Sequence, residues 1–351
     1  MTDDIAFLKQ AISIPSVSGK ETELASFLVS EMQSFCDEAF VDDSGSAIGV
    51  WGHGPLKITF LGHIDTVPGD IPVRIENDVL WGRGSVDAKG PFCTAVAASS
   101  YLDPQLKEKL SLRLIGATEE EAPSSKGARY AVQTYPKPDL VIIGEPSNWD
   151  ALTLGYKGRL VSKWQLAKAN FHSAGDDTTA AEDLVSIWQT LKAQADTFNS
   201  EIRGIFDALQ ISLQSISSSS DGLEQRAEAT IGYRLPPSLS PDELIEKIEA
   251  LRLQAKAEFV GKEIAYRSDK DTALTRAFRL SIRQHEGKPR FKVKTGTSDM
   301  NVVAPVWNVP MLAYGPGDSS LDHTPEERLE LGEYKKAIAV LTTALELLAK
   351  A

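Results

Sequence analysis

His63 and Asp65 have the spacing of a metal ligand and its supporting acid. They lie two residues apart in Gly62-His63-Ile64-Asp65, so in an extended backbone their side chains point the same way. Asp65 can then accept a hydrogen bond from the imidazole nitrogen that does not face a metal, which fixes the orientation of a ligating histidine. A lone histidine is more often a hydrogen-bonded structural residue than a metal ligand, and the spacing to Asp65 is what favours the ligand.

Carboxylates supply further candidate ligands. Asp87 lies in the glycine-rich segment 82–90, where it could also be the N-cap of a following helix. Three consecutive glutamates, Glu119, Glu120 and Glu121, follow an apolar run. Adjacent like charges raise one another's pKa unless a cation compensates, although a solvated loop also accounts for this cluster.

Glu145 and His323 complete the set of candidate ligands. Glu145 follows the apolar run 140–143, and His323 lies in a loop near the end of the chain. Two histidines and several carboxylates suit zinc, whereas calcium and magnesium favour shells of oxygen alone. A pair of divalent ions could share one carboxylate and take one histidine and one further carboxylate each.

The elements that must position these residues are short buried strands. The runs 58–61, 112–115 and 140–143 are mostly apolar, and each is followed by a candidate ligand. They alternate with helical segments such as 89–101, which predicts an α/β fold with an open, mostly parallel sheet. Because ligands of such sheets bind beyond the carboxyl ends of the strands, one site could collect all the candidates.

Helices are predicted at both ends of the chain. Residues 4–13 form the first, and Ser18 with Glu21 matches a capping box for a second helix through Phe35. Later in the chain, the pattern predicts a helix from near Asp271, a strand over 310–314 and a final helix from Leu331.

The middle of the chain has a different pattern, which predicts an inserted α+β domain. It comprises strands over 159–167 and 225–235, helices over 178–196 and 241–259, and a serine-rich turn over 215–220. The two strands could leave an edge free for pairing between subunits. The predicted domains are the catalytic one, 1–157 with 271–351, and the insertion, 158–270.

Composition and charge exclude several classes of function. The net charge of −12 disfavours binding to nucleic acid. Cys36 and Cys93 are the only cysteines and form no C-x-x-C pattern. The sequence therefore has too few cysteines for a disulfide framework or a thiolate zinc site. The N-terminus is acidic where a signal peptide is basic, and no apolar run approaches the length that spans a bilayer. We therefore expect a cytoplasmic protein with no membrane partner.

Together and in this order, these segments resemble the zinc exopeptidase and deacylase family that includes acetylornithine deacetylase, succinyl-diaminopimelate desuccinylase and glutamate carboxypeptidase. The resemblance extends from Ile14-Pro-Ser-Val-Ser-Gly19 to Asp322-His-Thr-Pro-Glu-Glu327. It implies a zinc-peptidase domain that holds two divalent ions per subunit, Zn²⁺ or Co²⁺. The implied ligands are His63 and Glu145 for one ion, Glu120 and His323 for the other, and Asp87 as the bridge.

The resemblance also implies roles for other residues. Glu119 falls on the family's general base, and Asp65 on the partner of the first ligand histidine. The insertion would be a ferredoxin-like lid and dimerisation domain of a homodimer, in which His172 stabilises the oxyanion in the partner's active site. Residues that match substrate-contacting positions are Arg234, Thr297 and Asp299.

The motifs 62–69, 82–91 and 294–301 look most like the lysine-biosynthesis branch of this family. The resemblance implies release of lysine, or ornithine in some relatives, from the C-terminal glutamate of a small acidic carrier protein, LysW. A net charge of −12 opposes an acidic carrier. We therefore expect a basic rim around the cleft, formed by Lys89, Lys126, Arg129, Lys157 and Arg159.

Two other classes of function stay open. A small-molecule deacylase, such as the acetylornithine deacetylase of arginine biosynthesis, would use the same metals on a small acylated amino acid. A non-catalytic binding protein of the same fold would be expected to have lost the base or the ligands, and all of them are present.

Overall fold

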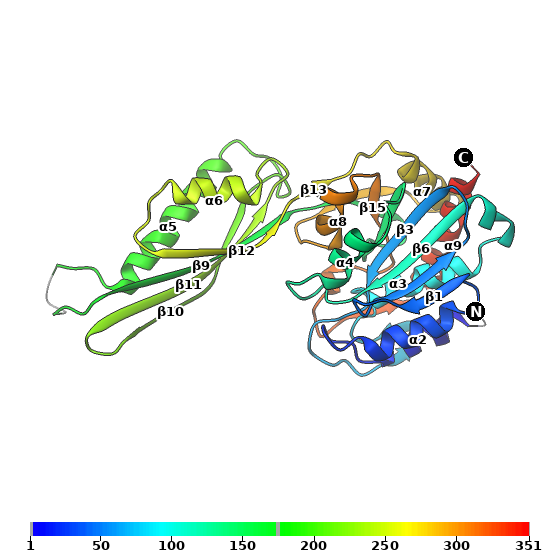
Figure 1. Ribbon diagram of the computed structural model, residues 1–351, viewed down its shortest axis with the longest axis horizontal. Coiled ribbons are helices and arrows are strands. Elements are labelled where there is room, and N and C mark those ends of the chain that lie inside the picture. Colours follow the sequence, from blue (N-terminus) through cyan, green and yellow to red (C-terminus); the bar gives the residue numbers. More distant parts are fainter. Residues whose placement is uncertain (1–2, 173–175, 351) are drawn as a thin grey trace. The chain divides into compact units, whose positions relative to one another are not determined.

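The computed structural model describes residues 3–172 and 176–350. The chain forms two structural units, both drawn in Figure 1. Unit 1 contains the residues up to Gly155, Ser268–Val293 and those from Ser298 on. Unit 2 contains Tyr156–Arg267 and Lys294–Thr297, so it is an insertion into the chain of unit 1.

Unit 1 is built on a central sheet with the strand order β1-β2-β6-β3-β7-β15-β8. The strands are β1 Glu38–Val41, β2 Ala47–Trp51, β3 Leu56–His63, β6 Leu110–Ala117, β7 Leu140–Gly144, β8 Ala151–Tyr156 and β15 Met311–Ala313. The neighbours β6, β3, β7 and β15 are parallel, while β1, β2 and β8 pair antiparallel at the two sides. This confirms the predicted α/β fold with an open, mostly parallel sheet.

Four short strands lie outside this order. β14 (Arg290–Lys294) pairs with β8. β4 (Arg74–Glu76), β5 (Val79–Trp81) and β16 (Arg328–Glu330) form a separate antiparallel sheet. The last strand of this small sheet follows the loop that contains His323, so the sheet anchors one end of that loop.

The helices of unit 1 bury small residues against the sheet and against one another. They are α1 Asp4–Ser13, α2 Thr22–Met32, α3 Lys89–Ser100, α4 Lys126–Thr134, α7 Ala273–Gln284, α8 Asp299–Trp307 and α9 Leu331–Ala349, with 3₁₀ turns η1 Pro104–Glu108 and η2 Ser319–Leu321. All residues of α3 from Lys89 to Ser99 are buried. Its alanines and serines allow close packing against α1, α9 and β3. None of the described helices is both long and apolar enough to span a bilayer.

Unit 2 has the chain order strand, helix, strand, strand, helix, strand of a ferredoxin-like fold. Its elements are β9 Gly158–Ala169, α5 Ala180–Phe198, β10 Gln210–Ser220, β11 Glu224–Leu235, α6 Pro241–Glu249 and β12 Lys256–Glu263, followed by the short β13 Tyr266–Arg267. The four long strands form an antiparallel sheet in the order β10-β11-β9-β12. Helices α5 and α6 lie on one face of it (Figure 1), where they share an apolar core with β9 and β11.

Two element predictions for unit 2 are wrong. The serine-rich segment 215–220 is the second half of β10, because it pairs residue by residue with 225–230 of β11. The helix predicted over 241–259 ends at Glu249, and the alternating residues Lys256-Ala257-Glu258-Phe259 begin β12. The edge predicted for 159–167 and 225–235 is also wrong, since β9 and β11 are each paired on both sides.

Candidate metal centre

The ends of three adjacent parallel strands bring the candidate ligands together. His63 is the last residue of β3, the three glutamates follow β6, and Glu145 follows β7. Because β6, β3 and β7 are parallel neighbours, their carboxyl ends meet at one edge of the sheet. Asp87 arrives from the loop before α3, and its side chain does not cap that helix, whose N-cap is Ala88.

Asp87 lies between the two histidines. Its Oδ1 is 3.1 Å from Nε2 of His63, and its Oδ2 is 3.0 Å from Nε2 of His323. The Asp87 side chain is 10% exposed and that of His63 is 1% exposed, whereas His323 is half exposed. One carboxylate thus presents a separate oxygen to each imidazole, which is the arrangement of a carboxylate shared between two metal ions.

Each histidine has its own further carboxylates. Around Nε2 of His63, Glu145 Oε1 and Glu120 Oε2 each lie at 3.9 Å. Around Nε2 of His323, Glu121 Oε1 lies at 2.8 Å. Ligand atoms of His63, Asp87 and Glu121 all lie within 4.8 Å of one another. The arrangement therefore divides into a His63 half and a His323 half that share Asp87.

The structure places the glutamates one residue later than the sequence predicts. The resemblance assigns Glu119 as the base and Glu120 as a ligand, but Glu119 Oε2 accepts from Ser124 Oγ at 2.6 Å and its Oε1 is 3.9 Å from Lys126. Glu120 and Glu121 are the residues that lie in the cluster, with side chains 13% and 10% exposed. The backbone of Glu119 has φ of 58°, which turns the chain between these side chains.

Asp65 holds the backbone of the glutamate loop as well as His63. Its carboxylate accepts from the backbone N–H of Glu120 and of Glu121, each at 3.0 Å, and from Ser18 Oγ at 2.7 Å. Nδ1 of His63 is 3.4 Å from Asp65 Oδ1 and 3.0 Å from the Asp65 carbonyl oxygen. Burial acts to raise the pKa of Asp65, but these hydrogen bonds hold it below its usual value.

Glu21 performs a similar task that the sequence does not reveal. Its Oε1 accepts from the backbone N–H of Gly19 at 2.9 Å and of Glu119 at 3.1 Å, and the residue is 5% exposed. The predicted capping box is therefore wrong: α2 starts at Thr22, and its N-cap residue, Glu21, makes no side-chain cap. Ser18 and Glu21 have the spacing of a helix cap, but their side chains bond elsewhere. Ser18 donates to Asp65, and Glu21 accepts from the backbone of Glu119.

Glu327 positions Asp87 from the other side. Its Oε1 accepts from the backbone N–H of Val86 at 3.0 Å and of Asp87 at 3.1 Å, and its Oε2 pairs with Arg83 at 2.8 Å. The residue is completely buried. It belongs to the His-Thr-Pro-Glu-Glu segment, so one segment supplies both His323 and the support of the carboxylate that His323 contacts.

The electrostatics of this cluster favour cations. Burial raises the pKa of Glu120 well above its usual value; His63 opposes the shift, while Glu145 and Asp299 add to it. Burial likewise raises the pKa of Asp299 to about 8. Neither carboxylate oxygen of Asp299 has a hydrogen-bond partner in the described part of the chain. Crowded, buried carboxylates with two imidazoles are the donor set of divalent ions such as zinc, so the residues fit a metal centre.

The remaining predicted site residues fall into separate groups. In unit 2, Arg234 Nη1 donates to Thr297 Oγ1 at 3.2 Å. In unit 1, Asp299 is the first residue of α8 and faces the charges of His63 and Glu145. His172 is exposed in the loop after β9, next to residues 173–175, which lie outside the described part.

Two residues of the predicted basic rim are buried. Lys89 is 2% exposed, and its Nζ donates to the carbonyl oxygen of Ile14 at 2.7 Å. Lys157 is fully buried, and its Nζ donates to the carbonyl oxygen of Ile205 at 2.9 Å and to Gln210 Oε1 at 3.0 Å. Both ammonium groups are enclosed by acceptors of the chain itself, so the rim as predicted is wrong. Lys126 and Arg129 are exposed on α4.

The amino-acid sequence is similar to a family of peptidases and to hydrolases of that family. Residues 59–347 match the model of peptidase family M20/M25/M40. A LysW-lysine hydrolase from Deinococcus radiodurans is 58% identical over 344 residues, which cover 96% of this chain and 95% of that protein. A protein from Thermococcus kodakarensis, named provisionally as a LysW-lysine/LysW-ornithine hydrolase, is 41% identical over 98% of this chain and 92% of its own length.

The fold has close counterparts among solved structures. The M20 family metallo-carboxypeptidase Sso-CP2 from Sulfolobus solfataricus superposes with a TM-score of 0.83, with 100% of both chains covered. The sequences are only 18% identical, so this likeness speaks for the fold alone.

Proposed function

The chain belongs to peptidase family M20/M25/M40, and from this premise we propose that it hydrolyses the amide bond joining lysine to the carrier protein LysW. Membership of the family makes the chain a hydrolase. The substrate is proposed because a relative 58% identical over nearly the whole chain is a LysW-lysine hydrolase. The reaction would belong to lysine biosynthesis.

The observation that carries the proposal is the position of Asp87 between two imidazoles. We assign His63, Asp87 and Glu145 to one divalent ion, and His323, Asp87 and Glu121 to a second, with Zn²⁺ as the preferred metal and Co²⁺ as a substitute. The support is the division of the cluster into two halves that share Asp87. When bound, such ions polarise a scissile carbonyl and lower the pKa of a water.

Glu120 is the general base of the proposed reaction. Its carboxylate lies in the cluster but is assigned to neither ion, and burial raises its pKa, so it takes up a proton more readily than an exposed glutamate. It would remove a proton from the attacking water and pass it to the leaving amine of lysine. Glu119, whose carboxylate accepts from Ser124, has no part in this transfer.

Two further residues are proposed to contact the substrate, and each is argued from its own surroundings. Arg234, held by Thr297, offers a guanidinium for the carboxylate of the lysine product. Asp299 stays a substrate-pocket candidate because both its buried oxygens lack a hydrogen-bond partner in the described residues. Asp65 is a positioning residue, because it acts through His63 and the glutamate loop.

A homodimer is part of the proposal. β10 is an edge strand with a largely exposed face, and pairing of two such edges across a two-fold axis would join two copies. His172, exposed in the same unit, would then serve the partner subunit's active site. Cytoplasmic location stays a prediction from the sequence.

The test is turnover by the zinc-loaded and the cobalt-loaded protein on three substrates: LysW carrying lysine, LysW carrying ornithine, and N-acetylornithine. We expect rapid release of lysine from LysW and poor turnover of N-acetylornithine, with activity lost on chelation. If N-acetylornithine is turned over well while both LysW conjugates are inert, the chain is a small-molecule deacylase and the carrier assignment is wrong.

A further inference from the structure

The fold holds the two histidines of the metal centre in different ways. His63 is the last residue of β3, where its backbone pairs with Ala117 of β6, and its side chain is 1% exposed. His323 lies in a loop, with φ of 61° and a side chain that is 52% exposed. Loops are more mobile than the strands of a sheet. The sheet therefore fixes the His63 half, whereas the His323 half depends on contacts made by its loop.

Arg83 makes such a contact. Its Nη1 donates to the carbonyl oxygen of Thr324, the residue after His323, at 3.2 Å. The N–H and the hydroxyl of Thr324 both donate to the carbonyl oxygen of Leu321, within the same loop. These two bonds shape the loop but do not tie it to another segment. The bond from Arg83 joins the loop to the segment that carries Asp87.

The same guanidinium reaches Asp87 through Glu327. Nη1 of Arg83 is 2.8 Å from Oε2 of Glu327, and the two side chains are 13% and 1% exposed. Oε1 of Glu327 accepts from the backbone N–H groups of Val86 and Asp87. A planar guanidinium donates in fixed directions, so it holds its acceptors in a fixed relation to one another. Arg83 thus links Asp87 to His323, whose Oδ2 and Nε2 atoms lie 3.0 Å apart.

A third bond holds the guanidinium itself. Nε of Arg83 donates to the carbonyl oxygen of Gly69 at 2.9 Å. Gly69 has φ of 111°, which favours glycine, and a Cβ there would lie 3.3 Å from Nη2 of Arg83. The segment 64–69 continues from β3, and its Thr66 N–H donates to the carbonyl oxygen of Ser16 at 2.9 Å. The arginine is therefore anchored to the part of the fold that also holds the first histidine.

Metal ligands must be placed closely. Bonds from zinc to imidazole nitrogen and carboxylate oxygen are about 2.0–2.2 Å long, with a tolerance of roughly 0.2 Å. A loop that shifts by more than this no longer completes the site. Removing a group that orients a ligand typically weakens metal binding about 10–100-fold. Loss of Arg83 should weaken the ion at His323 and spare the ion at His63, which β3 fixes.

We propose that Arg83 is the positioning residue of the His323 half of the metal centre. Its guanidinium holds the loop after His323 and, through Glu327, the backbone of Asp87, so the site of the second ion forms only when this arginine is in place. This rests on the proposed function, because it presupposes the two ions assigned there.

The test is a titration of the metal-free protein with Co²⁺, followed by calorimetry and by the visible absorption of the bound ion. We expect two ions in the wild type. Arg83→Ala should bind one ion as the wild type does and the other about 10–100-fold more weakly. Arg83→Lys, which keeps the charge without the planar fork, should lie between them. His323→Ala identifies the weakened ion, because adding Arg83→Ala to it should not change the remaining ion further.

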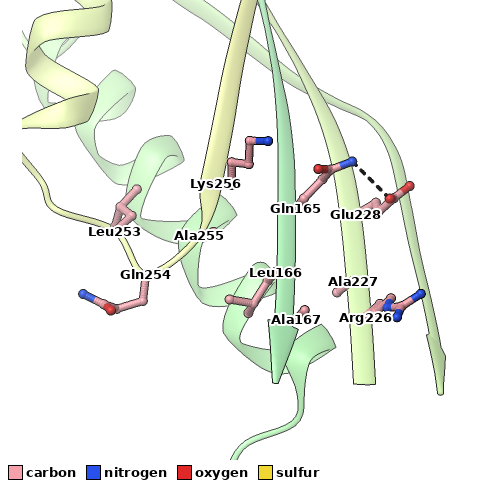
Figure 2. Close-up of a pocket in the computed structure, with 10 residues that line it drawn as sticks. All are labelled: Gln165, Leu166, Ala167, Arg226, Ala227, Glu228, Leu253, Gln254, Ala255 and Lys256. Carbon is pink, nitrogen blue, oxygen red and sulfur yellow. Dashed lines mark hydrogen bonds between the residues drawn. The ribbon is translucent and has the colours of Figure 1, made fainter. Parts of the chain in front are cut away.

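Two control variants should bind both ions as the wild type does. Arg74→Ala removes another arginine that pairs with a glutamate, Glu76, on β4 of the small sheet. Gln165→Ala removes a side chain beside a hollow of about 590 Å³ in unit 2 (Figure 2). There, Gln165 Nε2 donates to Glu228 Oε1 at 3.3 Å between two exposed residues.

Free guanidinium ion separates a positioning role from a general loss of structure. Arg83 lines a hollow of about 360 Å³ together with Val67, Pro68 and Ile71, so the ion can enter the space that an alanine leaves. At roughly 20 mM, far below the concentrations that unfold proteins, guanidinium should restore the second ion to Arg83→Ala. It should leave His323→Ala unchanged, and urea at the same concentration should restore neither variant.

The outcomes distinguish this role from the proposed function. Wild-type binding of both ions by the two Arg83 variants overturns the role, and so does equal weakening of both ions. If Arg83→Ala does not fold, Arg83→Lys decides by the same criterion. A wild type that does not bind two ions would overturn the metal centre of the proposed function, and this role with it. Two ions bound with LysW-lysine left intact would overturn the proposed substrate but not the role of Arg83.

Discussion

The carboxylate of Glu21 accepts a hydrogen bond from the backbone N–H of Glu119 at 3.1 Å, although 98 residues separate them in the chain. Asp65 accepts from the next two amides, those of Glu120 and Glu121. Two buried carboxylates thus hold three consecutive backbone N–H groups. The direction of each glutamate side chain depends on this backbone, so the two acids determine which glutamates reach the cluster.

Replacing Glu21 by alanine should therefore lower kcat. It leaves the N–H groups of Gly19 and Glu119 without their acceptor, at a cost of about 1–3 kcal/mol each if they stay buried. We expect kcat to fall on the order of tenfold, with KM little changed, because the shifted loop misplaces Glu120. Glu21→Gln should restore most of the activity, since the amide oxygen can accept both bonds. Glu23→Ala, in the exposed first turn of the same helix, is the control. Equal kcat in all of these variants would show that Glu21 does not position the loop.

Glu120→Gln and Glu119→Gln should behave very differently. Glu120→Gln removes the proposed base while preserving shape, so kcat should fall on the order of 10²-fold or more with metal content unchanged. Glu119→Gln should keep nearly full activity, because its side chain bonds to Ser124 away from the cluster. Steady-state kinetics and metal analysis of both variants decide whether Glu120 or Glu119 is the general base. A large loss in Glu119→Gln alone would return the role to the residue that the sequence resemblance indicates.

The contrast between these glutamates shows where sequence reasoning succeeds and where it stops. The ligand-bearing segments were predictable because parallel strands end at one edge, so His63, Glu145 and the glutamate cluster had to meet. The sequence did not allow us to predict which glutamate faces inward. That depends on the left-handed backbone at Glu119, a conformation that residue type does not dictate. Ser18 and Glu21 show the same limit, because side-chain spacing does not distinguish a helix cap from a contact made across the fold. Serines 215–220 form a strand because β11 supplies their hydrogen-bond partners.

The two thiols should be inert in the folded protein. Burial raises the pKa of Cys36 to about 12, with the charge of Asp37 adding to the shift, and burial raises the pKa of Cys93 further. Alkylating reagents attack the thiolate, which is scarce at pH 8 when the pKa is this high. We expect iodoacetamide at pH 8 to modify neither cysteine until denaturant restores a pKa of about 8.5. Mass spectrometry locates the label, and Cys36→Ser serves as a one-site control. Rapid labelling of the native protein at Cys36 would contradict this account of its burial.

The raised cysteine pKa values also set the sign of a pH effect on stability. A thiol whose folded pKa exceeds its unfolded pKa binds more protons in the folded state between the two values. For Cys36 that window runs from about 8.5, the unfolded value, to about 12, so its contribution to stability is present below the window and is lost as pH rises through it. Denaturant titrations at pH 8 and 10 should show a smaller loss of stability in Cys36→Ser than in the wild type. An equal loss in both proteins would assign the pH effect to other groups.

The proposed dimer makes a quantitative prediction for mixed variants. If the partner's His172 completes each active site, Glu120→Gln and His172→Ala proteins should both be nearly inactive alone. Random reassociation makes half of the dimers mixed, and in each of these one site combines an intact Glu120 with an intact histidine from the other chain. The mixture should therefore recover about a quarter of wild-type activity, one active site in four. Each variant dissociated and reassociated with itself is the control. Sedimentation should show a dimer in every sample; no recovery in proven mixed dimers would place His172 in its own subunit's site, and a fully active monomer would remove the dimer altogether.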